Sequence, residues 1–233
     1  MLLGERYQLL RRIATGGMAE IHLARQQTSS GFERLVAAKL LQERYRDEPR
    51  VVELFRGEAR IGLALSHAHM VQVYDVGEHE GTPFIVMEYL DGDVLSAVCR
   101  RGLERGSLLP QEHAVELVRQ AAEGMGYFHS RTDENGAPLE IVHRDISPSN
   151  LFVTRGGAIK VIDFGVARTR WSLDEDRAQP GKPNYMAPEQ VRGEPLDHRA
   201  DIFSLGIVLY EITVGKRLFK GRLEEVLEKI ARA

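Results

Sequence analysis

The chain has 233 residues and a formal net charge of −3, with 31 Lys and Arg against 34 Asp and Glu. This length suits one large domain or two small lobes with a substantial core, and the balanced charge excludes the strongly basic signature of nucleic-acid-binding or membrane-surface proteins. Cys99 is the only cysteine, which excludes an intramolecular disulfide framework and favours a reducing, cytoplasmic compartment. The longest apolar stretch, residues 202–214, is interrupted by polar residues and too short to span a bilayer, so no membrane segment is expected.

The first ninety residues predict short strands around a single helix. Four apolar runs have the length and composition of strands, at residues 7–13, 20–25, 35–40 and 84–89. Between residues 47 and 65 the pattern changes to that of a helix, with Pro49 where a first helical turn tolerates proline.

After residue 91 the pattern becomes mainly helical. Helices are predicted over residues 94–103, 111–129, 200–214 and 223–230. Residues 130–140 are polar and contain Gly and Pro, so a surface loop is expected there. The chain therefore divides into a sheet-rich part followed by a helical part.

Two carboxylates and an amide occur at a characteristic spacing in the helical part. His143-Arg144-Asp145 is followed by Asn150, five residues past the Asp, and by Asp163-Phe164-Gly165, eighteen residues past it. Such loops can hold divalent metal ions against a polyphosphate while a hydroxyl nucleophile is oriented. The spacing therefore predicts phosphoryl transfer.

In this order the motifs resemble those of eukaryotic-type protein kinases, and Gly16-Gly17-Met18 with Met186-Ala187-Pro188-Glu189-Gln190 resembles their bacterial Ser/Thr branch. The resemblance covers nearly the whole chain. It implies the two-lobed protein kinase fold of the α+β class: a small antiparallel-sheet N-lobe with one helix, residues 1–90, and a mainly helical C-lobe, residues 91–233. It further implies ATP and Mg²⁺ as cofactors, protein substrates with Ser/Thr acceptors, and self-association for trans-autophosphorylation.

The resemblance assigns the chemistry to the catalytic loop. Asp145 would accept or orient the proton of the substrate hydroxyl, and Asn150 and Asp163 would hold Mg²⁺. His143 and Phe164 are expected to serve packing. Asp201 begins a run that resembles the family's central buried helix, where it would brace the backbone of the catalytic loop.

A buried ion pair is expected between Lys39 and Glu58. Glu58 lies on the apolar face of the predicted helix, at helical spacing from Val51, Leu54, Ile61 and Leu65. A carboxylate there is costly unless it is paired with a cation. Val36-Ala37-Ala38-Lys39 resembles the family's lysine-bearing strand, so Lys39 is the expected partner and would also contact the α- and β-phosphates. An exposed strand lysine is the alternative.

The rest of the nucleotide site is implied by the resemblance. The phosphate lid keeps Gly16 but has Ala14 and Ala19 in place of two glycines, and a plain β-hairpin turn is the alternative interpretation. The hinge would bind adenine through its backbone, and Asp93 would reach the ribose. The residues assigned to ATP are Ala14, Gly16, Ile21, Ala37, Lys39, Glu88, Leu90, Asp93 and Phe152.

Two residues depart from the family pattern in a reciprocal way. Relatives usually carry Lys two residues after the catalytic Asp, where this chain has Ser147, and Thr where it has Lys182. Our hypothesis is that Lys182 reaches back and restores the missing charge, which makes it a fourth catalytic candidate beside Asp145, Lys39 and Glu58. The alternative is that Lys182 is a solvated residue and the enzyme is crippled.

Further expectations concern regulation and completeness. Arg144 would dock a phosphate on Thr169 or, in preference, Ser172. The last C-lobe helices of the family are missing, so we expect a fragment or a truncated gene product. Two other functions remain open: a pseudokinase that binds nucleotide as a scaffold or regulatory module, and a phosphotransferase for small molecules.

Overall fold

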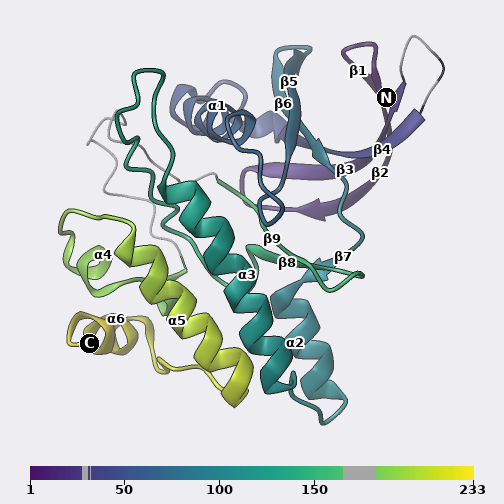
Figure 1. Ribbon diagram of the computed structural model, residues 1–233. Helices are drawn as coiled ribbons and strands as arrows, with labels where there is room; N and C mark the ends of the chain where they lie inside the picture. The colour runs from purple at the N-terminus through teal and green to yellow at the C-terminus, as the bar shows by residue number, and fades with distance from the viewer. Residues whose placement is uncertain (28–30, 32, 165–181) are drawn as a thin grey trace. The chain divides into compact units, whose positions relative to one another are not determined.

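The computed structural model describes residues 1–27, 31, 33–164 and 182–233 (Figure 1). The expected phosphorylation sites, Thr169 and Ser172, lie outside these residues. The chain forms two compact units, one made of Met1–His67 and Val71–Asp91 and the other of Ala68–Met70 and Gly92–Ala233. In the described part of the chain, no helix combines the length and apolar character that crossing a bilayer would need.

The first unit is a six-stranded antiparallel sheet with the strand order β1-β2-β3-β4-β6-β5. Its strands are β1 (Leu2–Leu3), β2 (Tyr7–Thr15), β3 (Ala19–Gln27), β4 (Glu33–Leu41), β5 (Val73–His79) and β6 (Thr82–Glu88). The four predicted strands are present. Sequence analysis missed β1, which has only two residues, and β5, whose apolar residues are few.

Alternation along β4 gives the sheet two different faces. Val36 and Ala38 belong to a cluster with Tyr7 and Phe84 on one face. Leu41 belongs to a cluster on the other face. Because successive side chains of a strand point to opposite faces, Lys39 lies on the same side as Leu41.

Helix α1 (Pro49–Leu63) packs on the Leu41 face and begins at Pro49, as the sequence predicts. Its buried residues are Phe55, Glu58, Ala59 and Gly62. Of the residues predicted to share its inward face, Glu58 and Leu65 are buried and Val51 packs against the cluster on the sheet, while Leu54 and Ile61 are half-buried. Phe55 and the small Ala59 pack directly in the cluster between the helix and the sheet.

The second unit is mainly helical, as expected, with a small antiparallel sheet. That sheet is formed by β7 (Gly92–Val94), β8 (Leu151–Thr154) and β9 (Ile159–Val161). The helices are α2 (Leu95–Glu104), α3 (Gln111–His129), α4 (Pro188–Arg192), α5 (Arg199–Val214) and α6 (Leu223–Ala231). Figure 1 shows α3 and α5 running side by side. Residues 130–140 are mostly exposed, and Thr132 bridges to Pro138.

Candidate active site

The backbone of the catalytic loop is held by one buried carboxylate on α5. Asp201 is 1% exposed and accepts hydrogen bonds from the backbone N–H groups of His143, at 2.8 Å, and Arg144, at 2.9 Å. The His129 ring nitrogen Nε2 lies 2.8 Å from the same carboxylate. Arg144 has a φ of 69°, a strained conformation for a non-glycine residue that surrounding contacts must maintain. The predicted bracing role of Asp201 is confirmed.

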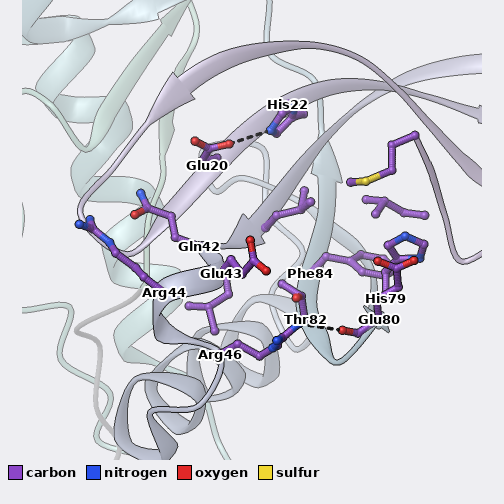
Figure 2. A pocket seen from close by; sticks show the side chains of 14 residues that line it. Glu20, His22, Gln42, Glu43, Arg44, Arg46, His79, Glu80, Thr82 and Phe84 are labelled. Carbon is purple, nitrogen blue, oxygen red and sulfur yellow. Dashed lines mark hydrogen bonds and ion pairs between the residues drawn. The ribbon is translucent and has the colours of Figure 1, made fainter.

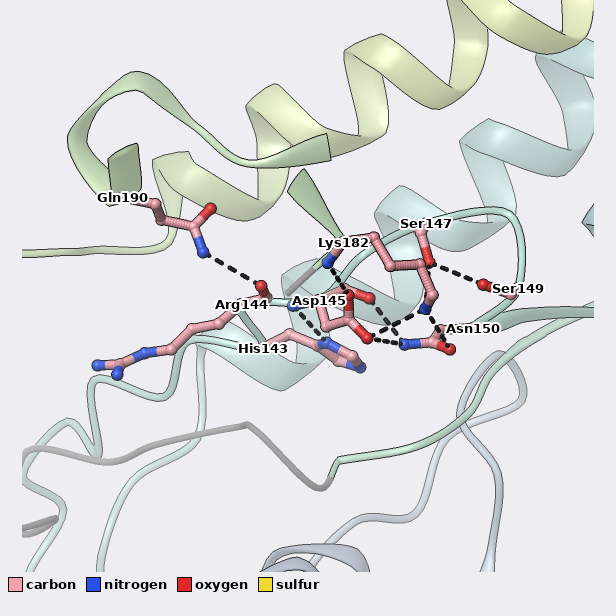
Figure 3. A network of polar contacts seen from close by, with 8 residues as sticks. All are labelled: His143, Arg144, Asp145, Ser147, Ser149, Asn150, Lys182 and Gln190. Atoms are coloured by element: carbon pink, nitrogen blue, oxygen red, sulfur yellow. Dashed lines mark hydrogen bonds and ion pairs between the residues drawn. The ribbon is translucent and has the colours of Figure 1, made fainter. Parts of the chain in front are cut away.

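The loop brings Asp145 and Asn150 into direct contact (Figure 3). The side-chain amide of Asn150 donates to the backbone carbonyl of Asp145, at 2.8 Å, and to its carboxylate Oδ2, at 2.7 Å. The N–H of Ile162 donates to the carbonyl of Asn150 at 2.9 Å. The residue after Ile162 is Asp163, so the three residues that the spacing singled out occupy adjoining stretches of backbone.

The donor groups of this site fit a hard divalent cation. Both amide hydrogens of Asn150 are directed at Asp145, which leaves its Oδ1 as an acceptor, and that oxygen faces the ammonium of Lys182 at 3.4 Å. An amide oxygen and the carboxylate of Asp163 are ligands of the type Mg²⁺ takes, with waters and phosphate oxygens completing the shell. Among the described residues there is no cluster of three or more His, Cys, Asp or Glu that could hold a metal ion. The assignment of Asn150 and Asp163 as metal ligands stays a prediction.

Lys182 lies within the same network, although it is remote in sequence from the catalytic loop. Its backbone N–H donates to Asp145 Oδ1 at 3.1 Å, and its ammonium lies 3.2 Å from Asp145 Oδ2. The ammonium also donates to Ser147 Oγ at 3.1 Å, and Ser147 Oγ is 3.2 Å from Ser149 Oγ. Figure 3 shows Lys182 pointing toward these residues. The Lys182 ammonium therefore reaches the catalytic loop, and its catalytic role stays a prediction.

The backbone after Lys182 is anchored to the helical core. A short 3-10 helix, η2 (Pro183–Tyr185), follows it directly. Ser204 on α5 donates to the carbonyl of Tyr185 at 2.6 Å, and the Tyr185 hydroxyl donates to Glu211 at 2.7 Å. Burial and this hydrogen bond to Glu211 raise the pKa of Tyr185. Asn184 donates to the carbonyl of Phe219 at 3.0 Å. The position of Lys182 therefore depends on how η2 docks on α5.

His143 and Phe164 pack with Phe128, as predicted for a structural pair. The rings of Phe128 and Phe164 are stacked with centroids 5.9 Å apart, and His143 lies 6.0 Å from Phe128 and 5.9 Å from Phe164. All three side chains are buried. His143 belongs to the motif of Asp145 and Phe164 to the motif of Asp163. Both motifs are thus packed against Phe128 on α3.

The predicted ion pair between Lys39 and Glu58 is present in the first unit. The Lys39 ammonium donates to Glu58 Oε1 at 2.5 Å, and the two residues are 8% and 6% exposed. Burial strengthens their mutual attraction but makes either charge costly alone. Lys39 is therefore held in a defined place, and its contact with phosphates stays a prediction.

The lid forms a tight hairpin turn between β2 and β3. Gly16 N–H donates to the carbonyl of Ala19 at 2.8 Å. The side chains of Gln42 and Arg44, which follow β4, donate to the carbonyls of Gly16, at 2.9 Å, and Gly17, at 3.0 Å. A β-carbon built on Gly17 would meet nothing within 4 Å, so the protein itself does not require glycine there.

Gln42 and Arg44 also line a cavity of about 590 Å³ in the first unit (Figure 2). Its lining includes apolar side chains and a mixed set of charged ones: Met1, Leu3, Leu40, Leu41, Phe84, Glu20, Glu43, Glu80, Arg46, His22, His79 and Thr82. None of the residues assigned to ATP is among them. The cavity is therefore separate from the predicted nucleotide site, although it shares the two residues that hold the lid.

The remaining residues assigned to ATP fall in both units. Ala14 is exposed, Ile21 and Leu90 are half-buried, and Ala37 is buried. The N–H of Glu88 donates to the carbonyl of Gln72, and the carboxylate of Glu88 accepts from the N–H of Gln72. In the second unit, Phe152 is half-buried, and the carboxylate of Asp93 accepts hydrogen bonds from Arg101, at 2.5 Å, and from the N–H of Val94, at 2.8 Å. The Arg101 hydrogen bond is the main cause of a lowered pKa of Asp93.

Sequence analysis missed three residues that position the site. Gln42 and Arg44 hold the lid, and Gln190 donates from its side chain to the carbonyl of Arg144 at 3.1 Å. Gln190 also accepts from the N–H of Ala187 at 2.9 Å. Gln42 and Arg44 have no spacing or periodicity that distinguishes them from surface residues, and Gln190 belongs to a recognised motif whose pattern does not reveal the hydrogen bond to Arg144.

The fold and the site together define a protein kinase domain. The family model for this domain matches residues 7–233, and the chain belongs to the protein kinase family. It is 44% identical over 215 residues to the tyrosine-protein kinase MasK of Myxococcus xanthus (strain DK1622). The matched residues cover 91% of this chain and 33% of that protein. It is 38% identical over 226 residues to the serine/threonine-protein kinase PknB of Mycobacterium leprae (strain TN), covering 94% and 34%. A probable serine/threonine-protein kinase of Clostridium perfringens (strain 13 / Type A) is 36% identical over 222 residues, which are 94% of this chain and 30% of that protein. The chain spans about a third of the length of these relatives.

Proposed function

We propose that this chain transfers the γ-phosphoryl group of ATP to serine or threonine hydroxyls of proteins. The observation that carries the proposal is the network in which Asp145, Asn150 and Lys182 meet on a loop braced by Asp201. A carboxylate and an amide oxygen that both lie within hydrogen-bond distance of one ammonium can orient a hydroxyl, hold a metal and neutralise phosphate charge. Phosphoryl transfer needs these three functions in one place.

In this proposal Asp145 orients the acceptor hydroxyl and accepts its proton. The bond between the acceptor oxygen and the γ-phosphorus forms while the bond from that phosphorus to the bridging oxygen breaks, and ADP leaves. The carboxylate of Asp145 is 16% exposed and is held by Asn150 and the Lys182 backbone. A base that is fixed in this way loses little entropy when the hydroxyl arrives.

We further propose Asn150 and Asp163 as the metal ligands and Mg²⁺ as the metal. A magnesium ion would draw charge from the phosphate oxygens. The ion pair of Lys39 with Glu58 supports a role for Lys39 at the α- and β-phosphates, because the pair fixes the ammonium. The residues assigned to adenine and ribose complete the nucleotide site in the proposal.

The acceptor residue and the partners are also proposals. The names of the relatives disagree, since one is a tyrosine-protein kinase and the others are serine/threonine-protein kinases. We propose Ser/Thr acceptors on protein substrates, and trans-autophosphorylation through transient self-association. The single cysteine, Cys99, supports a reducing compartment such as the cytoplasm.

The test is incubation of the chain with labelled ATP and Mg²⁺, with and without a generic basic protein, beside Asp145→Asn. We expect label on serine or threonine by phosphoamino-acid analysis, and a loss of roughly 10²–10⁴-fold in the variant. Nucleotide binding without transfer would instead make the chain a pseudokinase, and label on tyrosine would contradict the proposed acceptor. Wild-type chain should also label the inactive variant in trans.

A further inference from the structure

We propose that Lys182 supplies the positive charge that acts on the phosphoryl group in flight, so that Lys182 and Ser147 form one exchanged pair. The inference rests on the proposed function and names a further catalytic residue for it. It also makes that charge depend on a segment outside the catalytic loop.

The Lys182 ammonium lies beside both the proposed base and a proposed metal ligand. It is 3.2 Å from the Asp145 carboxylate and 3.4 Å from the Asn150 amide oxygen. The acceptor hydroxyl must contact Asp145, and the attacking and leaving oxygens are roughly in line through the phosphorus. The group being transferred must therefore pass within reach of an ammonium placed between the base and the metal ligand. Preorganised charge at that position is among the largest contributions to catalysis.

Lys182 brings a cation to the Asp145 carboxylate from outside the catalytic loop. In the described part of the chain, Lys182 is the only cation hydrogen-bonded to the Asp145 carboxylate. Ser147 is fully buried and neutral, and its hydroxyl accepts from the Lys182 ammonium. The lysine side chain and the hydroxyl are thus in contact, with the lysine on the segment before η2 and the hydroxyl on the catalytic loop.

The Lys182 backbone anchors its segment to Asp145 without help from the ammonium. The backbone N–H of Lys182 already bonds Asp145 Oδ1 at 3.1 Å, so the ammonium is not needed to tie the two segments together. The Lys182 side chain is 43% exposed. It can therefore move from the carboxylate to a nearby phosphate oxygen without disrupting a packed core.

A regulatory consequence follows from the position of Lys182. It directly precedes η2, which is held on the helical core by hydrogen bonds from Ser204 to the Tyr185 carbonyl and from Tyr185 to Glu211. The charge that neutralises the phosphoryl group is present only while η2 is docked. Turnover is thereby coupled to the conformation of this segment, whereas binding of the adenosine part of the nucleotide does not depend on that conformation.

The experiment compares Lys182→Met, Lys182→Arg and the exchanged variant Ser147→Lys/Lys182→Thr with wild type. Lys229→Met is the matched control, because it also removes one lysine, on α6, whose ammonium bonds the carbonyl of Lys220. Three quantities are measured: kcat at saturating ATP and Mg²⁺ with a basic protein substrate, the dissociation constants of ATP and ADP, and the thermal midpoint.

We expect Lys182→Met to lower kcat by about 10²–10³-fold, the size seen when one preorganised donor is removed. Its ADP affinity and thermal midpoint should stay near those of wild type, while its preference for ATP over ADP falls. Lys182→Arg should retain kcat within tenfold, Lys229→Met should match wild type, and the exchanged variant should recover at least tenfold over Lys182→Met.

Two results would overturn the inference: a kcat of Lys182→Met within threefold of wild type, or a well-folded exchanged variant with no recovery. If the exchanged variant has a lowered thermal midpoint, Lys182→Arg decides, and an arginine variant as slow as Lys182→Met rejects the charge role. Absence of transfer by wild type itself would contradict the proposed function instead.

Discussion

Replacing Asp201 by asparagine tests whether one buried carboxylate holds the catalytic loop. Asp201 accepts two backbone N–H groups at 2.8 and 2.9 Å, and His129 Nε2 lies 2.8 Å away. Charge-assisted hydrogen bonds contribute about 1.5–3 kcal/mol each. Asparagine keeps one acceptor oxygen but turns an NH₂ group toward a donor in a site that is 1% exposed.

We therefore expect Asp201→Asn to lower the free energy of unfolding by about 3 kcal/mol, or the thermal midpoint by roughly 6–12 °C for a chain of this length. Because the backbone of His143 and Arg144 would shift, kcat should also fall by about 10²-fold, the usual effect of a displacement near 1 Å. Thermal unfolding by circular dichroism and turnover with labelled ATP measure the two effects.

Asp197→Asn is the control, since Asp197 bonds Arg199 at the surface with its side chain 46% exposed. Exposed pairs of this kind contribute at most about 1 kcal/mol. The reasoning fails if Asp201→Asn loses no more stability than Asp197→Asn. It also fails if stability falls while kcat is unchanged, because the carboxylate would then not position the loop.

Two further predictions concern the first unit. Glu58→Met should destabilise the chain by about 3–5 kcal/mol because the buried Lys39 ammonium loses the Glu58 carboxylate. Lys39→Met/Glu58→Met should recover most of that stability without recovering transfer, and a double variant no more stable than Glu58→Met in urea unfolding contradicts this. Gln42→Ala removes the hydrogen bond to the Gly16 carbonyl, so the lid should loosen and the KM for ATP should rise about three- to tenfold, with kcat nearly unchanged. An unchanged KM for ATP in steady-state kinetics would show that Gln42 does not hold the lid.

Much of the fold could be predicted because its elements have strong local signals. Helix α3 has the predicted bounds, Gln111–His129, and α1 begins at Pro49. Elements with weak signals were missed: β1 has two residues, and β7 to β9 are three or four residues long. The burial of Ala59 on α1 was not predicted, because periodicity ranks positions by hydrophobicity, whereas packing against a sheet also favours a small side chain.

The candidate site divides in the same way. The spacing of Asp145, Asn150 and Asp163 could be recognised in the sequence because phosphoryl-transfer loops need those residue types in that order. Glu58 was readable because a carboxylate on an apolar helix face requires a cation. Gln42 and Gln190 were not, since each acts through one side-chain hydrogen bond to a distant carbonyl.

The sequence alone indicated the family by resemblance and identified the acid and amide groups of the catalytic loop, and it predicted the ion pair of Lys39 with Glu58. It also raised the exchange of Ser147 and Lys182 as a hypothesis. Only the tertiary structure decided where the Lys182 ammonium lies, within 3.4 Å of Asp145, Ser147 and Asn150. The physical reason is that Lys182 is 32 or more residues away from them in the chain, and its position depends on the docking of η2 on α5, which local sequence pattern does not encode.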